Sequence, residues 1–261
     1  MKLASYADGS RDGHLVVVSR DLTQAHFATG IATRLQQVLD DWGFLAPQLE
    51  DLAVQLNHGK LRHAFPFDPD KCLAPLPRAS GWAVVMADGA VRRDAGQFAG
   101  PHQPLRAPAV GEVALAAIAG DLSPASDTAA SLDALRLLTL AVDWRLDDEL
   151  IATQAAPLAV TPDELGTAWR TGRVQARLHA LHNGSKQPAR DVDAQPGAAL
   201  ARVARLRALR AGQVVGASLG ALDLTLTAGD SLHLDLKTAE GSSLFGALDL
   251  DIAPLAPTDL S

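Results

Sequence analysis

The sequence predicts an α+β, β-rich protein: a small N-terminal α/β unit followed by a larger, curled β domain. Residues 1–21 contain two strand-like segments joined by an Asp- and Gly-rich turn, which is typical of a hairpin. Apolar residues then recur at helical spacing over residues 29–42 and 46–58. Residues 214–252 contain several short apolar segments bounded by Gly and Asp, the pattern of a strand-rich domain.

A proline-rich segment separates the two units. Residues 65–77 contain repeated prolines, which cannot donate to a strand ladder, so this segment is predicted to be an extended linker. We therefore predict a small N-terminal domain over residues 1–78 and a C-terminal domain over residues 79–261.

The middle of the chain is predicted from local patterns. Residues 83–86 and 112–118 indicate strands, and residues 87–109 resemble a loop. A helix is predicted over residues 131–142. Thr161 and Glu164 have the spacing of a capping box that starts another helix. A strand over residues 174–181 ends at an Asn183-Gly184 turn, and residues 197–211 are predicted to be helical.

Composition excludes several classes of protein. Hydrophobic residues make up 48% of the 261 residues and charged residues 20%, which is ordinary for a globular protein. The net charge of −7 disfavours nucleic-acid binding. The basic stretch over residues 202–210 is interpreted as a solvated helix face. No apolar run approaches the ~18 residues of a membrane span. With the single cysteine Cys72, these features predict a cytoplasmic protein without nucleic-acid or membrane partners.

Several collinear segments carry a family resemblance. Residues 229–249 closely resemble the end of bacterial fumarylacetoacetate hydrolases, and residues 1–42 resemble their small N-terminal domain. The segments 65–79, 159–166 and 210–216 match as well. The resemblance implies a C-terminal domain that is a mixed β-sheet roll of the fumarylacetoacetate hydrolase type, and it implies a homodimer. It also implies a hydrolase that uses Mg²⁺ or Ca²⁺ to cleave a carbon–carbon bond of a β-diketo acid, of the fumarylacetoacetate or acylpyruvate class.

The same resemblance identifies candidate site residues. The family's Glu-x-Glu pair falls on Glu112 and Ala114, and its later metal-binding Asp falls on Asp143. Asp88 is the acid nearest the place of the remaining metal ligand. The resemblance therefore predicts Glu112, Asp143 and Asp88 as metal ligands. His102 is a candidate general base in the loop nearest this site.

The functional prediction follows from what has changed. The departures from the family pattern concentrate at residues 79–110, 147–153 and 217–222, where the family builds its active site. We expect a shortened, divergent member with a degenerate active site and with weak or lost activity, and the sequence leaves open whether it is an enzyme. The alternatives are a non-catalytic paralogue that acts as a dimerising or interaction protein, and an enolase- or decarboxylase-like chemistry at Glu112 and Asp143.

Overall fold

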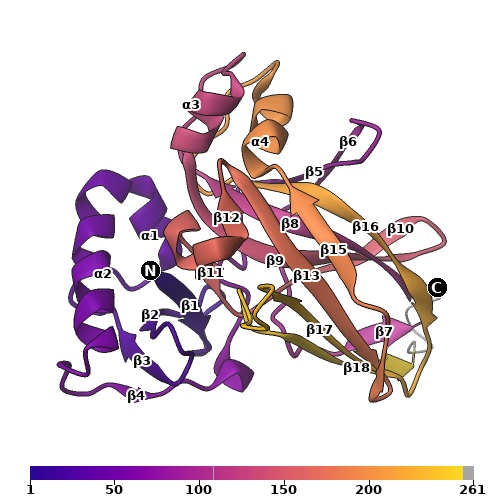
Figure 1. Ribbon diagram of the computed structural model, residues 1–261, viewed down its shortest axis with the longest axis horizontal. Coiled ribbons are helices and arrows are strands. Elements are labelled where there is room, and N and C mark those ends of the chain that lie inside the picture. The colour runs from indigo at the N-terminus through magenta and orange to yellow at the C-terminus, as the bar shows by residue number, and fades with distance from the viewer. Residues whose placement is uncertain (108, 255–261) are drawn as a thin grey trace.

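The computed structural model describes residues 1–107 and 109–254. Its N-terminal unit is a small antiparallel sheet covered by two helices (Figure 1). The strands are β1 (Lys2–Tyr6), β2 (His14–Val18), β3 (Gln24–Phe27) and β4 (Phe65–Pro66). The predicted hairpin of residues 1–21 is confirmed, because β1 and β2 pair antiparallel from Lys2–Val18 to Tyr6–His14.

The two helices are α1 (Leu35–Asp40) and α2 (Trp42–Asn57). The predicted helix over residues 29–42 is therefore wrong in its first turns, and the second helix begins earlier than residue 46. The Gln37 side chain explains the first boundary. Its Oε1 accepts hydrogen bonds from the backbone N–H groups of Thr33 and Arg34, so α1 starts only after these residues.

The linker contains more structure than predicted. Pro66 lies opposite Gln24 in β4, which is the edge strand of its sheet. Proline is tolerated in an edge strand because its missing N–H does not interrupt the hydrogen bonding of strands further inside the sheet. A short 3₁₀ helix, η1 (Pro69–Lys71), follows.

Eleven strands form the first sheet among the described residues, in the order β4-β3-β2-β1-β11-β9-β8-β16-β5-β6, with β10 also paired to β9. Its C-terminal members are β5 (Trp82–Val85), β6 (Val91–Asp94), β8 (Ala109–Ala119), β9 (Leu135–Leu146), β10 (Glu149–Ala155), β11 (Ala159–Val160) and β16 (Val214–Leu226). Because β1 pairs with β11, one sheet runs through both predicted domains. The boundary at residue 78 stays a prediction.

Seven strands form the second sheet within the described part of the chain, in the order β12-β13-β17-β18-β7, with β14 and β15 also paired to β13. These are β7 (Leu105–Ala107), β12 (Trp169–Arg170), β13 (Arg173–His182), β14 (Ser185–Lys186), β15 (Arg190–Ala194), β17 (Ser231–Lys237) and β18 (Leu248–Pro254). The pairs β16–β5 and β18–β7 are parallel, and the other pairs are antiparallel. The predicted α+β, β-rich fold with mixed sheets is confirmed.

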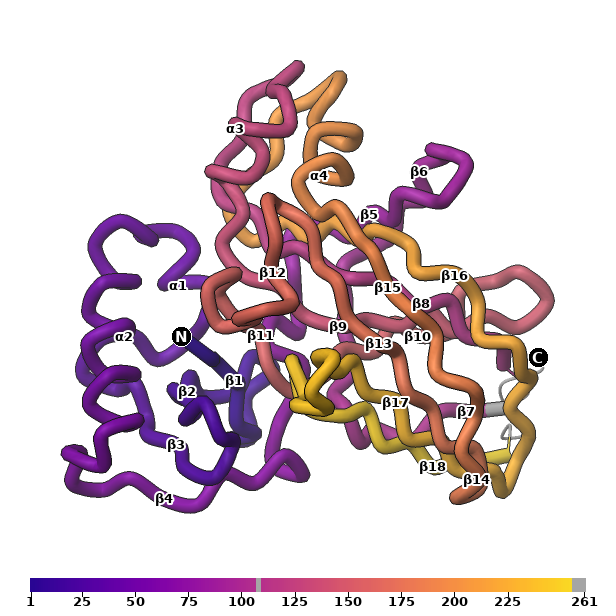
Figure 2. The backbone as a smooth tube through the Cα atoms, in the orientation of Figure 1, coloured from indigo at the N-terminus to yellow at the C-terminus, as the bar shows by residue number. Residues whose placement is uncertain are grey.

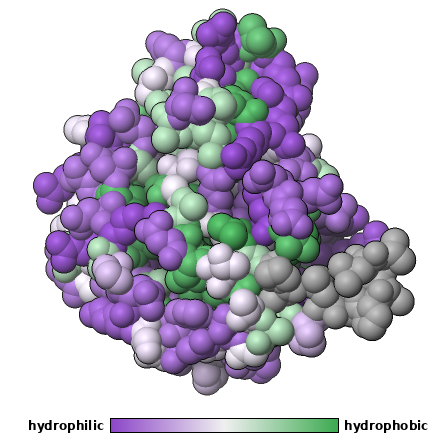
Figure 3. Space-filling model, turned by 90° about the vertical axis from the view of Figure 1, so that its right-hand side faces the viewer, coloured by the Kyte–Doolittle hydropathy of each residue, from purple (hydrophilic) through white to green (hydrophobic). Residues whose placement is uncertain are grey.

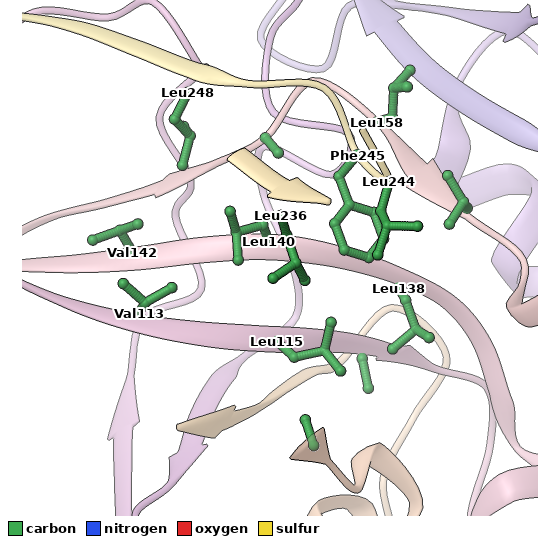
Figure 4. Close-up of a cluster of buried hydrophobic side chains, with 14 of the residues drawn as sticks. Val113, Leu115, Leu138, Leu140, Val142, Leu158, Leu236, Leu244, Phe245 and Leu248 are labelled. Carbon is green, nitrogen blue, oxygen red and sulfur yellow. The ribbon is translucent and has the colours of Figure 1, made fainter. Parts of the chain in front are cut away.

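The two sheets enclose a hydrophobic core (Figure 4). Val113 and Leu115 of β8 and Leu138, Leu140 and Val142 of β9 meet Leu236, Leu244, Phe245 and Leu248 from the second sheet and its loop. A second core lies on the opposite face of the first sheet, under α1 and α2. No helix within the described residues is long and apolar enough to cross a membrane.

Two short helices, α3 (Thr128–Asp133) and α4 (Pro196–Ala204), lie side by side and project from the sheets (Figure 2). The predicted helix over residues 131–142 is wrong after Asp133, because β9 begins at Leu135. Most of β9 is buried on both faces, and such a continuous apolar run does not distinguish a strand from a buried helix. The predicted loop over residues 87–109 likewise contains β6 and β7.

Two further helix predictions need correction. The predicted helix over residues 197–211 is α4, which ends at Ala204. The segment after Thr161 is a 3₁₀ helix, η2 (Pro162–Ala168), and Thr161 makes no side-chain cap. Its hydroxyl instead accepts a hydrogen bond from the Met1 ammonium group at 2.6 Å. Glu164 lies 3.3 Å from the same ammonium group and also binds Arg20, so tertiary contacts replace the predicted capping box.

Candidate functional site

Glu112 and Asp143 are neighbours on adjacent strands. They are direct partners in the antiparallel pair of β8 and β9, so their side chains lie on the same face of the sheet. The next position on this face of β8 is Ala114, which is paired with Ala141. The structure therefore brings together two of the three predicted carboxylates, and a methyl group occupies the position that in the family carries the second Glu.

Three hydrogen bonds hold the carboxylate of Asp143, which is only 5% exposed. The indole Nε1 of Trp82, on β5, donates to both oxygens, at 2.9 Å to Oδ1 and 3.2 Å to Oδ2. The hydroxyl of Thr153, on β10, donates to Oδ1 at 2.6 Å. Both oxygens of this carboxylate are thus used by donors from neighbouring strands.

Burial raises the pKa of Asp143 above its ordinary value of 3.8. The hydrogen bonds from Thr153 and Trp82 and the charge of Arg145 act against this increase, and the charge of Asp94 adds to it. Because desolvation is the largest cause, the ionised form of Asp143 depends on these two donors for its stability.

Both carboxylate oxygens of Glu112 also accept hydrogen bonds from protein side chains. Arg92, on β6, donates from Nη1 to Oε2 at 2.6 Å, and the Glu112 side chain is 14% exposed. Ser218, on β16, donates to Oε1 at 3.1 Å. Glu112 is therefore an ion-pair partner at the edge of the site, while Asp143 lies deeper in the protein.

The third predicted ligand lies elsewhere. Asp88 is in the turn between β5 and β6, where its side chain accepts a hydrogen bond from the backbone of Ala90. The adjacent Gly89 carbonyl accepts hydrogen bonds from Arg202 of α4, so this turn lies against α4. In residues 79–98, the acid that influences the pKa of Asp143 is instead Asp94.

The register of the β5–β6 hairpin explains the difference. Asp94 lies opposite Trp82 in this hairpin, and the indole of Trp82 binds Asp143. Asp94 therefore lies near the site, whereas Asp88 lies in the turn. A turn centred on Asp88 predicts this pairing by symmetry. Asp94 was therefore within reach of sequence analysis, had the segment been read as a hairpin.

His102 has no hydrogen bond or ion pair with Glu112 or Asp143. Its Nε2 is buried and lies 3.4 Å from Asp70, near the linker, without hydrogen-bond geometry. The candidate base and the candidate carboxylates thus remain separate in the described residues.

The donor set around these carboxylates does not fit a divalent cation. Mg²⁺ and Ca²⁺ need several oxygen lone pairs that point toward the ion. Here N–H and O–H groups of Trp82, Thr153, Arg92 and Ser218 use the carboxylate oxygens, and one of these donors is a positively charged guanidinium. Within the described residues, no cluster of three or more His, Cys, Asp or Glu side chains could hold a metal ion.

Other residues considered from the sequence have structural contacts. Cys72 is buried, and burial raises the pKa of its thiol, which disfavours a nucleophilic thiolate. His179 pairs opposite Asp235 and His182 binds Asp230, so the two imidazoles do not share a site.

A comparison with known proteins gives the relationships of the chain. Residues 1–78 match the sequence family described as fumarylacetoacetase N-terminal domain 2. No curated protein sequence matches the chain.

Solved structures match almost its whole length. A maleylpyruvate hydrolase from Sphingobium sp. SYK-6 has a TM-score of 0.74 at 15% identity, covering 98% of this chain and 100% of that one. The same enzyme has been solved with manganese(II) and pyruvate. A fumarylacetoacetate hydrolase from Exiguobacterium antarcticum has a TM-score of 0.74 at 16% identity, with the same coverage. A 2-hydroxyhepta-2,4-diene-1,7-dioate isomerase from Mycobacterium marinum has a TM-score of 0.67 at 15% identity, covering 97% of this chain and 98% of that one. At these identities the structural likeness concerns the fold.

Proposed function

We propose that the chain is a non-catalytic member of the fumarylacetoacetate hydrolase family that acts through its surface. Its residues 1–78 match the fumarylacetoacetase N-terminal domain, and its fold is that of solved hydrolases of this family, which supports the family part of the proposal. One observation carries the proposal. The indole N–H of Trp82 donates to both oxygens of Asp143, the residue that resembles the family's metal-binding Asp. Asp143 is then an internal anchor that joins strands β5, β9 and β10.

The physical argument is competition for lone pairs. A cation at Asp143 would compete with Trp82 and Thr153 for the roughly four lone-pair positions of the carboxylate, and a donor that it displaced would be left buried without an acceptor. An unpaired buried donor costs about 1–3 kcal/mol, so ion binding would begin with a deficit. Ala114 supplies no carboxylate to offset it.

A second candidate function has a specific observation in its favour. Glu112 and Asp143 lie directly opposite each other on β8 and β9, as two ligands of one ion would. The candidate is hydrolysis of a carbon–carbon bond in a β-diketo acid of the fumarylacetoacetate or acylpyruvate class, with Mg²⁺ or Ca²⁺. One structural neighbour, a maleylpyruvate hydrolase, has been solved with manganese(II) and pyruvate, which makes Mn²⁺ a suitable probe.

The proposed partner is a second copy of the chain, forming the homodimer that the family resemblance implies. A reducing compartment such as the cytoplasm is the proposed location, because Cys72 is the single cysteine and its thiol is free and buried. Neither proposal depends on activity at Asp143.

Calorimetric titration separates the two functions. Mn²⁺, Mg²⁺ and Ca²⁺ are each titrated to millimolar concentration into the wild-type protein, Asp143→Asn and, as a matched control, Asp88→Asn. We expect no saturable binding that depends on Asp143, and no hydrolysis of acetylpyruvate in the presence of any of the three ions.

The opposite result would be equally clear. Saturable binding in the wild type and Asp88→Asn that is lost in Asp143→Asn, together with acetylpyruvate hydrolysis lost in the same variant, would establish the metal-dependent hydrolase instead.

A further inference from the structure

A cavity of about 190 Å³ lies where β13 and the β14–β15 connection of the second sheet meet the last part of β16 of the first sheet. Strands β15 and β16 lie side by side there (Figure 1). Most of its lining is apolar and comes from β13, β16 and the β14–β15 connection: Leu178, Ala180, Pro188, Leu222 and Leu224. Its polar lining consists of Gln187, Arg190 and Asp223. The cavity is smaller than the usual 300–1,000 Å³ of a drug-sized site, so only a small ligand would fit.

Arg190 brings a positive charge to the inner side of the sheet. It pairs opposite Leu178, a core residue, and alternation along β15 puts it on the same face as the buried Val192 and Ala194. The arginines of the neighbouring strand behave differently. Arg173 and Arg177 of β13 form ion pairs with Asp193, whose side chain is about half exposed, and with Asp191, whose side chain is largely exposed.

The guanidinium of Arg190 is only partly satisfied. Its Nη1 donates to the backbone carbonyl of Ala221 at 2.8 Å. Its Nε and Nη2 are buried, and neither has a hydrogen-bond acceptor among the described residues. Buried charged groups in proteins are normally paired, because an unpaired one loses its hydration without compensation.

The two unsatisfied atoms are the pair that binds a carboxylate side-on. Arg173 uses Nε and Nη2 in this way, at 2.9 Å and 2.6 Å from the two oxygens of Asp193, and Arg78 uses the same two atoms on Asp12. This bidentate geometry is the preferred one for a guanidinium and a carboxylate. Arg190 lines the cavity and has no carboxylate partner among the described residues, so a rotation of its side chain would expose these two atoms to a carboxylate in the cavity.

We propose that this cavity binds a small carboxylic acid with an apolar body. The carboxylate would bind Nε and Nη2 of Arg190, and the apolar body would pack against Leu178, Leu222 and Leu224. The site would be a second feature of the protein, independent of whether Asp143 binds a metal.

Asp223 is the competing group. Its charge opposes an anion in the cavity, and it could also form an ion pair with Arg190 through a different side-chain rotamer. In the structure Asp223 is exposed between the more buried Leu222 and Leu224, and it has no ion pair with Arg190. The test must therefore distinguish an external carboxylate from Asp223.

Benzoate is a suitable probe and benzamide is its neutral isostere. Calorimetric titration is expected to show saturable benzoate binding to the wild type and at least about tenfold weaker binding of benzamide, because a hydrogen-bonded charge pair is lost. Arg190→Gln should lose at least about tenfold in benzoate affinity. Asp223→Asn should bind benzoate as well as the wild type or more tightly. Arg177→Gln removes an exposed arginine from the outer face and should leave binding unchanged.

Chemical unfolding of the same variants keeps the test decisive if benzoate binding is weak. An unpaired buried guanidinium loses its hydration without compensation, so Arg190→Gln should unfold at or above the wild-type midpoint, and Asp223→Asn should unfold close to it. Equal benzoate affinity in Arg190→Gln and the wild type would overturn the proposal, as would no saturable benzoate binding at millimolar concentration. Equal destabilisation by Arg190→Gln and Asp223→Asn would overturn it too, since it would reveal an Arg190–Asp223 ion pair.

Discussion

At the scale of single residues, the partners of a carboxylate decide its role more than its identity does. Asp143 is in register with Glu112, as the resemblance to a metal site requires. Yet it is buried, and it accepts hydrogen bonds from an indole and a hydroxyl. We propose that these contacts make Asp143 a structural element, because an ion that displaced either donor would leave it buried and unpaired, at a cost of about 1–3 kcal/mol.

Trp82→Phe tests the anchoring role. The substitution removes the N–H group and keeps most of the ring, which packs against Phe98 at a centroid distance of 5.2 Å. At neutral pH we expect Trp82→Phe to lower the free energy of unfolding by about 1.5–3 kcal/mol more than the control Trp144→Phe does, which is the range for a hydrogen bond to a charged group. Trp144→Phe is the matched control, because Trp144 is fully buried and its indole N–H has no acceptor in the part of the chain that the structure describes.

The change of the free energy of unfolding with pH provides a second test of this hydrogen bond. The pKa of Asp143 is raised in the folded protein, so the stability linked to it is complete below 3.8 and falls as pH rises through the folded pKa. Losing the Trp82 donor raises that pKa further. The destabilisation by Trp82→Phe should therefore grow as pH rises through the folded pKa of Asp143, while that of Trp144→Phe stays constant in urea unfolding curves. Parallel behaviour of the two variants would contradict the role of the N–H bond.

At the scale of elements, the contact between α3 and α4 depends on a glycine. A Cβ added at Gly197, in the first turn of α4, would lie 2.6 Å from Cγ of Leu132 on α3. A Cβ added at Gly172 would also lie 2.6 Å from Leu132, at Cδ1. Leu132 is thus confined from two sides and cannot easily move away.

Gly197→Ala is expected to destabilise the protein by about 1–3 kcal/mol, the usual cost of overpacking. Gly43→Ala is the control, because Gly43 is also the second residue of its helix and nothing lies within 4 Å of the added Cβ. The control should be neutral or stabilising by up to about 1 kcal/mol. Thermal unfolding measures both effects. If Gly197→Ala and Gly43→Ala change the unfolding temperature by the same amount, the α3–α4 contact is not close-packed.

Local signals were enough for some elements and too weak for others. The β1–β2 hairpin and the strand ending at Asn183-Gly184 were predicted because alternation and turn residues are local properties. Strand β9 was predicted as a helix because both of its faces are buried, so the alternation that identifies a strand is absent. The β5–β6 hairpin was missed because its turn and charged outer strand resemble a loop.

At the scale of the whole molecule, the chain is proposed to form a homodimer. The face that carries the β5–β6 and β9–β10 hairpins is largely hydrophilic, with hydrophobic side chains in patches between the charged ones (Figure 3). Size-exclusion chromatography with light scattering is expected to give twice the chain mass of 27.3 kDa at micromolar concentration. A mass of one chain at tens of micromolar would rule out a stable dimer, whose interface typically buries about 1,200–2,000 Å².

The sequence alone determined the β-rich class, several strands and turns, and the family resemblance. Through that resemblance it also identified Glu112 and Asp143 as candidate metal ligands. These follow from local periodicity and from motifs that survive in linear order. Only the tertiary structure decided what those carboxylates contact. Trp82 lies 61 residues from Asp143 in the chain, and the two meet because β5 joins the sheet through β16. Arg190 likewise acquires its unpaired donors only when β15 faces β16. Hydrogen-bond partners across a sheet depend on strand order and register, which no local pattern specifies.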